Sequence, residues 1–367
     1  MKIDSLSIYR YETKLKQPWI TAYGADYTVE QVLFCLRSGG YEGWGESSPL
    51  NHPTYSPEYS KDVFAVNAEL FAPLILGKEI ESGDELQQIF SFVKGHYFAK
   101  SGFDLAWWDL ASKMAGVPMW KFIGGVNRHP ESGADFGYQK TIDDLLRKID
   151  NVKDIAPRIK LKYGPGWGLE VLRVVRETFP KLTFHIDCNS AYTLDDLPMF
   201  REVDKLGLAM IEQPLANDDL IDHATLQKAI QTPICLDESL VTPDKARKAI
   251  QIGSCKYFNL KTGRLGGITP ILKTCDLARE AGIGCWVGGM LETGIGRWAR
   301  LAVASRAEIT YPSDIGAPKP SPLLRVPIEF VPGTMHYDLD ETRPGSGADV
   351  DIESVRDQIL EEFHLDK

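Results

Sequence analysis

The sequence predicts a (β/α)8-type barrel that follows a smaller α+β domain. From about residue 133 onward, short apolar segments alternate with amphipathic segments, as strands and helices do when they follow one another. Charged residues also end the apolar segments, at intervals of 25, 25, 25 and 24 residues. A charge at the end of a buried strand is costly unless it is paired or bound to a metal, so this regularity predicts a single site. The five charged residues are Lys162, Asp187, Glu212, Asp237 and Lys261.

The same interval extends along the chain in both directions. Counting back from Lys162 reaches Gly137, and counting forward from Lys261 reaches Trp286 and then Tyr311. Eight strand ends at this spacing are typical of a closed barrel, whose active site lies at the carboxyl ends of the strands. An open doubly wound sheet is the alternative, but it would not bring five consecutive strand ends to one point.

The first 125 residues follow a different pattern, with strands first and helices afterwards, which predicts an α+β domain. Two segments, Gln17–Tyr27 and Pro49–Pro57, are predicted to be loops. Ser101 and Asp104 have the spacing of a capping box, which predicts that a helix begins there. The expected strands are residues 2–11, 29–37 and 41–46, and the expected helices are residues 58–72, 83–95 and 101–114.

Amphipathic helices separate the strands of the predicted barrel. In Glu170–Phe179, valine and leucine side chains share one face and charged side chains share the other. Beyond Tyr311 the chain is rich in proline, which predicts an exit segment, and a helical pattern follows from Ile352 to Phe363. Further helices are expected at about residues 195–205, 220–230, 243–252 and 268–281. We expect an α+β domain at residues 1–125, a barrel at 126–317, and a C-terminal segment at 318–367 that packs back on the first domain or on the barrel exterior.

Composition excludes several classes of protein. The chain is 43% hydrophobic and 25% charged, as a globular protein is, and its net charge of −10 argues against a nucleic-acid or anionic-membrane partner. We expect no signal peptide, because Met1-Lys2-Ile3-Asp4 does not begin an apolar run, and no stretch approaches the ~20 apolar residues that span a membrane. The six cysteines lack metal-binding spacing, which predicts reduced thiols in a cytoplasmic protein. The sequence leaves a monomer and a homo-oligomer both open.

Three of the periodic residues, Asp187, Glu212 and Asp237, are carboxylates that would converge at one end of the barrel. Three converging negative charges repel strongly in a cavity of low dielectric constant. A hard divalent cation resolves this repulsion, and carboxylate oxygens suit Mg²⁺, with Mn²⁺ as the alternative.

Two lysines would flank this metal. Lys160 and Lys162 are two residues apart on one strand and therefore share a face, whereas Lys261 comes from the opposite wall. A free lysine has a pKa of about 10.4, but a neighbouring ammonium and a cation both favour its neutral form. Lowering the pKa by ~3 units corresponds to roughly 4 kcal/mol. A basic lysine beside a metal and a second amine predicts an enzyme that removes the proton α to a carboxylate of a small-molecule substrate.

The motifs around these residues resemble the enolase superfamily, in its muconate-lactonizing branch. Gly288–Gly296 and Leu105–Gly125 resemble the group of o-succinylbenzoate synthases and N-acylamino acid racemases within that branch. The resemblance extends over essentially the whole chain. The matching motifs are Lys160-Leu161-Lys162, Asp187-Cys188-Asn189, Ile211-Glu212-Gln213-Pro214, Leu236-Asp237-Glu238-Ser239 and Asn259-Leu260-Lys261.

The resemblance implies an α+β capping domain on a modified (β/α)7β barrel, with the two predicted loops closing over the substrate. It implies that Lys162 removes the α-proton, that Lys160 lowers the pKa of Lys162, and that Lys261 steadies the enediolate intermediate. The implied Mg²⁺ ligands are Asp187, Glu212 and Asp237. The residues expected to contact the substrate are Asn189, Gly288, Gly289, Met290, Tyr23, Tyr55, Asp135 and Arg264.

The resemblance also implies the reaction. The leading expectation is the Mg²⁺-dependent dehydration of 2-succinyl-6-hydroxy-2,4-cyclohexadiene-1-carboxylate in menaquinone biosynthesis, and racemisation of N-acylamino acids is the alternative or a second activity. A dipeptide epimerase fits less well, because Ser313-Asp314-Ile315 has one Asp where that group has Asp-x-Asp. Muconate cycloisomerase is a further alternative. A barrel without catalysis disagrees with the presence of all three carboxylates and all three lysines.

Four features outside the periodic set need separate interpretation. Asp135 stands where relatives tend to carry a small hydroxyl side chain, and its charge would repel a dicarboxylate substrate. Arg264 follows Lys261 closely and would favour its neutral form, or else form a surface salt bridge. The Gly294-x-Gly296 turn is interpreted as a cradle for the substrate carboxylate at a helix N-terminus rather than as a nucleotide site. His185 is expected to be a core residue.

Overall fold

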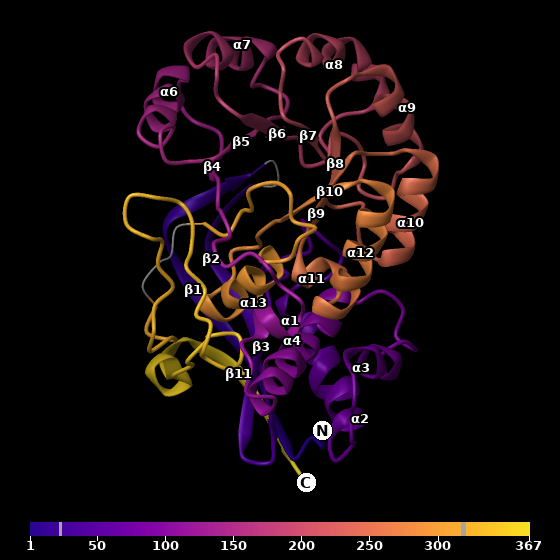
Figure 1. Ribbon diagram of the computed structural model, residues 1–367, viewed down its shortest axis with the longest axis vertical. Coiled ribbons are helices and arrows are strands. Elements are labelled where there is room, and N and C mark those ends of the chain that lie inside the picture. The colour runs from indigo at the N-terminus through magenta and orange to yellow at the C-terminus, as the bar shows by residue number, and fades with distance from the viewer. Residues whose placement is uncertain (22–23, 317–320) are drawn as a thin grey trace.

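The computed structural model describes residues 1–21, 24–316 and 321–367, and for residues 16–21 and 24–26 it describes the backbone alone. Two separate sheets organise these residues. Figure 1 shows the parallel strands inside an arc of helices at one end of the molecule, and the antiparallel sheet with its own helices at the other end, near both termini. Among the described residues, no helix combines the length and the apolar character needed to cross a membrane.

The parallel sheet has seven strands in the order β10-β9-β8-β7-β6-β5-β4. Segment 309–314 takes the eighth position, since Ile309 bridges to Cys285 of β10 and Ser313 bridges to Ser132, close to β4. This arrangement confirms the modified (β/α)7β barrel. The strands are β4 (Ala134–Phe136), β5 (Ile159–Lys162), β6 (Phe184–Asp187), β7 (Ile211–Glu212), β8 (Ile234–Leu236), β9 (Tyr257–Leu260) and β10 (Gly284–Val287).

The carboxyl ends of these strands coincide with the periodic charges. Lys162, Asp187 and Glu212 are the last residues of β5, β6 and β7, and Asp237 and Lys261 directly follow β8 and β9. The parallel register places Lys162 opposite Asp187 and Asp187 opposite Glu212. One end of the sheet therefore carries all five charged residues.

Helices cover the outside of the barrel. Their apolar faces, such as Leu172 and Val175 of α7, are fully buried in the same core as Ile186 of β6. The helices are α6 (Ile142–Asp150), α7 (Leu169–Thr178), α8 (Leu197–Asp204) after a 3-10 turn η2 (Leu194–Asp196), α9 (Ile221–Ala229), α10 (Pro243–Ile252), α11 (Thr262–Leu265), α12 (Ile268–Ala281) and α13 (Gly294–Ala304).

The antiparallel sheet has the order β11-β1-β2-β3 and packs against helices of the first domain. Its strands are β1 (Ser5–Thr21), β2 (Gly24–Ser38), β3 (Tyr41–Ser47) and β11 (Ile359–Asp366), and its helices are α1 (Ser60–Val66), the π-helix η1 (Asn67–Phe71), α2 (Ala72–Ile75), α3 (Gly83–Ile89), α4 (Tyr97–Met114) and α5 (Met119–Phe122). The prediction of a loop at Gln17–Tyr27 was wrong for its described part, because β1 continues to Thr21 and β2 begins at Gly24.

Three helix predictions also need correction. Helix α3 ends at Ile89 rather than at residue 95. Helix α4 begins at Tyr97 rather than Ser101, because the Glu58 carboxylate accepts the N–H groups of Phe98 and Ala99 at 3.0 and 2.9 Å and caps the helix. The expected C-terminal helix is a short 3-10 helix η3 (Ile352–Gln358) followed by strand β11. Strand β11 pairs antiparallel with β1, because alternate side chains such as Phe363 pack on the core of the first domain. The domain boundaries at residues 125 and 317 remain predictions.

Strand β3 and helix α4 approach each other so closely that only glycine fits between them. A Cβ at Gly45 would lie 2.5 Å from the backbone nitrogen of Ala106 and closer still to the carbonyl oxygen of Gly102. Gly45 also precedes Glu46, which contacts the barrel. This contact therefore fixes β3 against α4 within the first domain, and β3 in turn carries Glu46 to its partner Thr293.

We expect Gly45→Ala to destabilise the protein by about 1–3 kcal/mol, because the added carbon forces two backbones apart. The shift in thermal or urea midpoint measures this loss. Gly168→Ala is the matched control, since a Cβ there would meet nothing within 4 Å. An unchanged midpoint in Gly45→Ala would contradict the close packing of β3 on α4.

Candidate active site

A cavity of about 430 Å³ lies at the carboxyl ends of the barrel strands. The first domain contributes Leu50, Thr54 and Tyr55 to its wall, and the connection between β10 and α13 contributes residues 289–292. Eight of the residues predicted from the sequence line this one cavity: Lys160, Lys162, Lys261, Asn189, Gly289, Met290, Tyr55 and Asp135. The sequence therefore predicted the location of the cavity and much of its wall.

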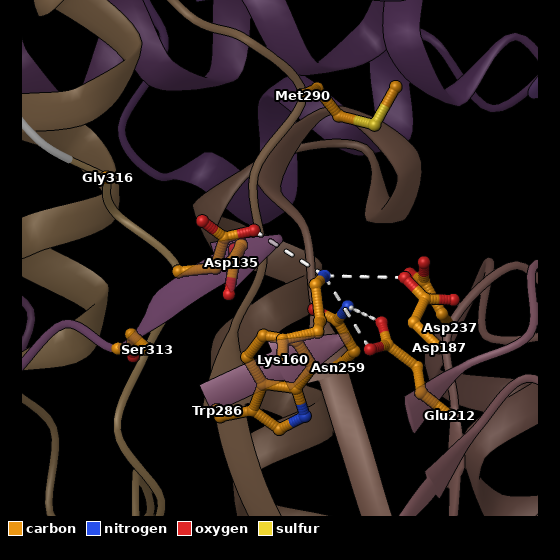
Figure 2. Close-up of polar contacts among 12 residues, drawn as sticks. Asp135, Lys160, Asp187, Glu212, Asp237, Asn259, Trp286, Met290, Ser313 and Gly316 are labelled. Carbon is orange, nitrogen blue, oxygen red and sulfur yellow. Dashed lines mark hydrogen bonds and ion pairs between the residues drawn. The ribbon is translucent and has the colours of Figure 1, made fainter. Parts of the chain in front are cut away.

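Lys160 lies among the carboxylates (Figure 2). Its Nζ is 3.4 Å from Asp187 Oδ2 and 3.6 Å from Glu212 Oε2, and it lies 5.2 Å from the centre of the Trp286 ring. Burial opposes the charged form of Lys160. The negative charges of Glu212, Asp135 and Asp187 outweigh this effect and raise the pKa of Lys160 above its usual value. Lys160 therefore acts here as a fixed positive charge.

The other two lysines pair with different carboxylates. Lys162 Nζ donates to Asp187 Oδ2 at 2.7 Å and to Asn189 Oδ1 at 2.6 Å. Lys261 Nζ donates to Asp237 Oδ2 at 2.8 Å, and burial of this amine is outweighed by nearby groups that raise its pKa. Because β5 and β9 are separated by three strands in the sheet, the two amines reach the cavity from different sides.

Tyr55 connects the first domain to this charge network. Its hydroxyl donates to Asp237 Oδ1 at 3.2 Å and accepts from Lys261 Nζ at 3.0 Å. Arg264 also contacts the Tyr55 hydroxyl, at 2.9 Å, and forms a buried ion pair with Asp237. The alternative of a surface salt bridge was wrong for Arg264, because the residue is only 2% exposed.

The three carboxylates fit a hard divalent cation. Asp187 and Glu212 are register neighbours at the ends of β6 and β7, and Asp237 follows β8, so the donor set consists of oxygen atoms on adjacent strands. Glu212 Oε2 is buried and has no hydrogen-bond partner in the described part of the chain. Lys160 Nζ at 3.6 Å and His185 Nε2 at 3.5 Å lie at or beyond the limit of a hydrogen bond to this oxygen, and a buried acceptor without a hydrogen bond is expensive. Asp187, Glu212 and Asp237 would hold the metal.

A different cluster lies in the first domain. Within the described ranges, Glu58, Asp62 and His96 form the one group of three metal-binding side chains whose ligand atoms all lie within 4.8 Å of one another. Both Glu58 oxygens already accept backbone N–H groups of α4, so this cluster caps a helix. The predicted metal ligands are spread further apart, with their oxygens turned toward Lys162, Lys261 and Lys160.

Two neutral side chains, those of Asn259 and His185, contact the Glu212 carboxylate. Asn259 Nδ2 donates to Glu212 Oε1 at 2.7 Å, and His185 Nε2 lies 3.5 Å from Oε2. Burial lowers the pKa of His185 to about 4, so this ring is neutral near pH 7. His185 is fully buried, as expected for a core residue, and its other ring nitrogen lies 3.0 Å from the Tyr311 hydroxyl.

Asp135 has a positive partner that the sequence prediction did not include. The fully buried Arg158 forms an ion pair with Asp135 and donates to the carbonyl oxygen of Ser313 at 2.8 Å. Burial raises the pKa of Asp135 to about 7, although Arg158 acts in the opposite direction. Lys160 overcomes burial and holds the pKa of the nearby Asp314 well below its usual value. The ion pair with Arg158 therefore offsets part of the repulsion that was expected between Asp135 and a dicarboxylate substrate.

Three residues that were expected to contact the substrate are not found in the described part of the cavity wall. The Gly288 N–H donates to Leu260 within the barrel, and a side chain there would collide with Asn259, so Gly288 supports packing below the cavity wall. Arg264 lies behind Asp237 rather than in the wall. Tyr23 falls outside the described residues.

The helix N-terminus at Gly294-x-Gly296 already has an anion. The buried Glu46 carboxylate of β3 accepts the N–H groups of Thr293 and Gly296, both at 2.8 Å, and the Thr293 hydroxyl at 2.5 Å. Positive helix N-termini favour such carboxylates. The prediction of a substrate cradle here was wrong, because a protein carboxylate fills the position.

Sequence reasoning did not assign a role to several residues at this cavity. Asp314, Glu292, Arg297 and Arg300 line the cavity, and the buried Glu238 accepts from Asn189 at 2.9 Å. Asp314 lies three residues after Tyr311, the eighth predicted strand end, so the residue spacing could have identified it. Glu292, Arg297 and Arg300 lie in a loop or inside α13, where residue spacing carries no signal. Glu238 directly follows Asp237 and was quoted only as part of a motif.

An α+β domain over a barrel with carboxylates and lysines at its strand ends defines an enolase-type protein. Residues 4–124 match the mandelate racemase / muconate lactonizing enzyme N-terminal domain, and residues 144–355 match the enolase C-terminal domain-like family. The chain belongs to the enolase superfamily, in the group of o-succinylbenzoate synthases and N-succinylamino acid racemases.

Individual relatives support this assignment. An o-succinylbenzoate synthase from Geobacillus kaustophilus is 38% identical over 99% of this chain and 98% of its own length. An N-succinylamino acid racemase from Thermus thermophilus is 40% identical over 86% of each chain. The crystal structure of an enolase superfamily member from Listeria innocua has a TM-score of 0.95 and 31% identity, covering 100% of this chain and 99% of that one.

We expect chelation by EDTA to remove activity and added Mg²⁺ or Mn²⁺ to restore it. Glu212→Gln should weaken Mn²⁺ binding by more than about 10-fold, measured by calorimetry, since even partners of metal ligands contribute 10- to 100-fold. Glu202→Gln, at a partly exposed position of α8 away from the predicted ligands, is the control. Activity that is indifferent to EDTA would contradict the metal site.

Proposed function

We propose that this protein is an o-succinylbenzoate synthase, a lyase that dehydrates 2-succinyl-6-hydroxy-2,4-cyclohexadiene-1-carboxylate. The observation that carries the proposal is the pair Lys162 and Lys261 on one cavity, with three carboxylates at the strand ends between them. The names of the synthases that are 35–38% identical to this chain support the same reaction.

Lys162 is the proposed base. It reaches the cavity from β5 and removes the proton α to the substrate carboxylate when its amine is neutral. The same amine, now protonated, then donates to the departing hydroxyl group, so that water leaves from the face that lost the proton. Its present partners, Asp187 and Asn189, hold it at the cavity wall.

Two further amines provide fixed positive charge. Lys261 and Lys160 both have raised pKa values, which suits groups that stay protonated while negative charge develops on the substrate carboxylate. A bound divalent cation would supply additional charge stabilisation at the same carboxylate. Tyr55 orients Lys261 through its hydroxyl.

Racemisation of N-succinylamino acids is the second candidate, as an additional activity of the same site. It needs an acid and a base on opposite faces of the α-carbon, and Lys162 and Lys261 approach the cavity from different strands. The Thermus thermophilus racemase supports this reading through its 40% identity. Both reactions share the first step, removal of the α-proton.

Lys162→Ala should abolish both dehydration and racemisation while the fold stays intact, because the base is lost. Steady-state rates with each substrate and a circular dichroism spectrum measure the two outcomes. Lys205→Ala, at an exposed position directly after α8, is the matched control. Substantial dehydration by Lys162→Ala would overturn the assignment.

Arg264→Gln should reduce racemisation more than dehydration. Racemisation requires Lys261 to exchange its proton, and a guanidinium that shares Tyr55 and Asp237 with this lysine favours the neutral form. Dehydration needs Lys261 only in its protonated, positively charged form. The ratio of the two kcat/KM values checks this, with the exposed Arg247→Gln as control. Equal losses in both assays would count against the role.

A further inference from the structure

Arg300 is a buried arginine with an incomplete set of partners. It lies in α13, is 2% exposed and lines the active-site cavity. Its Nη1 donates to Glu292 Oε2 at 2.6 Å. Its Nε and Nη2 are buried and have no hydrogen-bond partner among the described residues. These two nitrogens form the side-on edge of the guanidinium, which can donate two parallel hydrogen bonds to one carboxylate.

The neighbouring backbone leaves room for this guanidinium at the cavity wall. A Cβ at Gly289 would lie 2.8 Å from Arg300 Nη2 and 3.0 Å from Nη1. Gly289 itself lines the cavity. Glycine at this position therefore lets the guanidinium lie directly beside the cavity wall, where a side chain would collide with it.

Nearby carboxylates are already committed to other partners. Glu292 Oε2 accepts from the Met290 N–H at 2.8 Å as well as from Arg300 Nη1. Asp314 pairs with Lys160 at 3.6 Å. Buried N–H groups without an acceptor are costly, and those of a charged group more so. The unpaired edge of Arg300 therefore calls for an acceptor that enters from the cavity.

We propose that Arg300 binds the carboxylate at the far end of the substrate's succinyl arm. This inference rests on the proposed function, since both candidate substrates carry that arm. The reacting carboxylate belongs near Lys160 and the strand-end acids, whereas Arg300 comes from α13, beyond β10. One substrate dianion would thus span two separate positive regions of one cavity. Arg300 would then determine specificity for a terminal carboxylate, and water alone at this edge is the competing occupant.

The experiment compares two ligands that differ at this group alone. N-succinylmethionine carries a terminal carboxylate where N-butyrylmethionine carries a methyl group. Calorimetry with Mg²⁺ present gives the ratio of their affinities without requiring turnover, and kcat/KM values give the ratio in catalysis. We expect the wild-type protein to favour the succinyl ligand by at least about 30-fold, the lower range for a buried charge pair that loses one partner.

In Arg300→Gln this preference should fall at least 10-fold, and Arg300→Lys should restore it in part, because lysine keeps the charge without the paired edge. Gly289→Ala is the second variant if Arg300→Gln fails to fold, and its added carbon should also lower the ratio. The exposed Arg279→Gln is the matched control.

Each outcome separates the inference from the proposed function. A preference that stays unchanged in Arg300→Gln, or a wild-type ratio near one, overturns the role of Arg300 and indicates water at its free edge. Equal losses for both ligands indicate a structural role and also overturn it. A succinyl preference that depends on Arg300, without any turnover, supports the inference and counts against the proposed function.

Discussion

Mutual neutralisation of buried charges at the strand ends is the constraint on which the rest of the structure depends. Lys162 pairs with Asp187, Lys261 pairs with Asp237, and Lys160 lies near Asp187 and Glu212. Any of these charges alone would be costly in this buried position, so the barrel can carry them only as a set. The parallel register supplies the set, because adjacent strands end at the same height.

The first domain completes this site rather than merely covering it. Tyr55 reaches Asp237 and Lys261, and Glu46 occupies the N-terminus of α13. Through α13, Glu46 also helps to fix the helix that carries Arg300. In the proposed function, the shared chemistry belongs to the strand ends, whereas the proposed choice of substrate depends on Arg300 of α13.

Spacing predicted the barrel, its strand ends, Lys162 and Lys261, because a closed parallel sheet repeats in sequence as it does in space. Lys160 was predicted from its place two residues before Lys162 on the same strand. Spacing could not predict Arg158 beside Asp135, or Glu46 at α13, because these partners depend on tertiary packing that no local pattern encodes. The prediction of a C-terminal helix was wrong for a similar reason. Strand β11 pairs with the free edge of β1, and this pairing overrides the local helical preference of the segment. Asp314 was recognised only as a departure from another group's motif.

The central claim is that this arrangement removes a proton α to a carboxylate. Hydrogen exchange in D₂O tests it most directly, because exchange reports the first step regardless of the product. With Mg²⁺ and N-succinylmethionine, the account predicts loss of the α-proton NMR signal and a mass increase of one unit in recovered ligand. Full retention of the α-proton, under conditions where calorimetry shows the ligand bound, would contradict it.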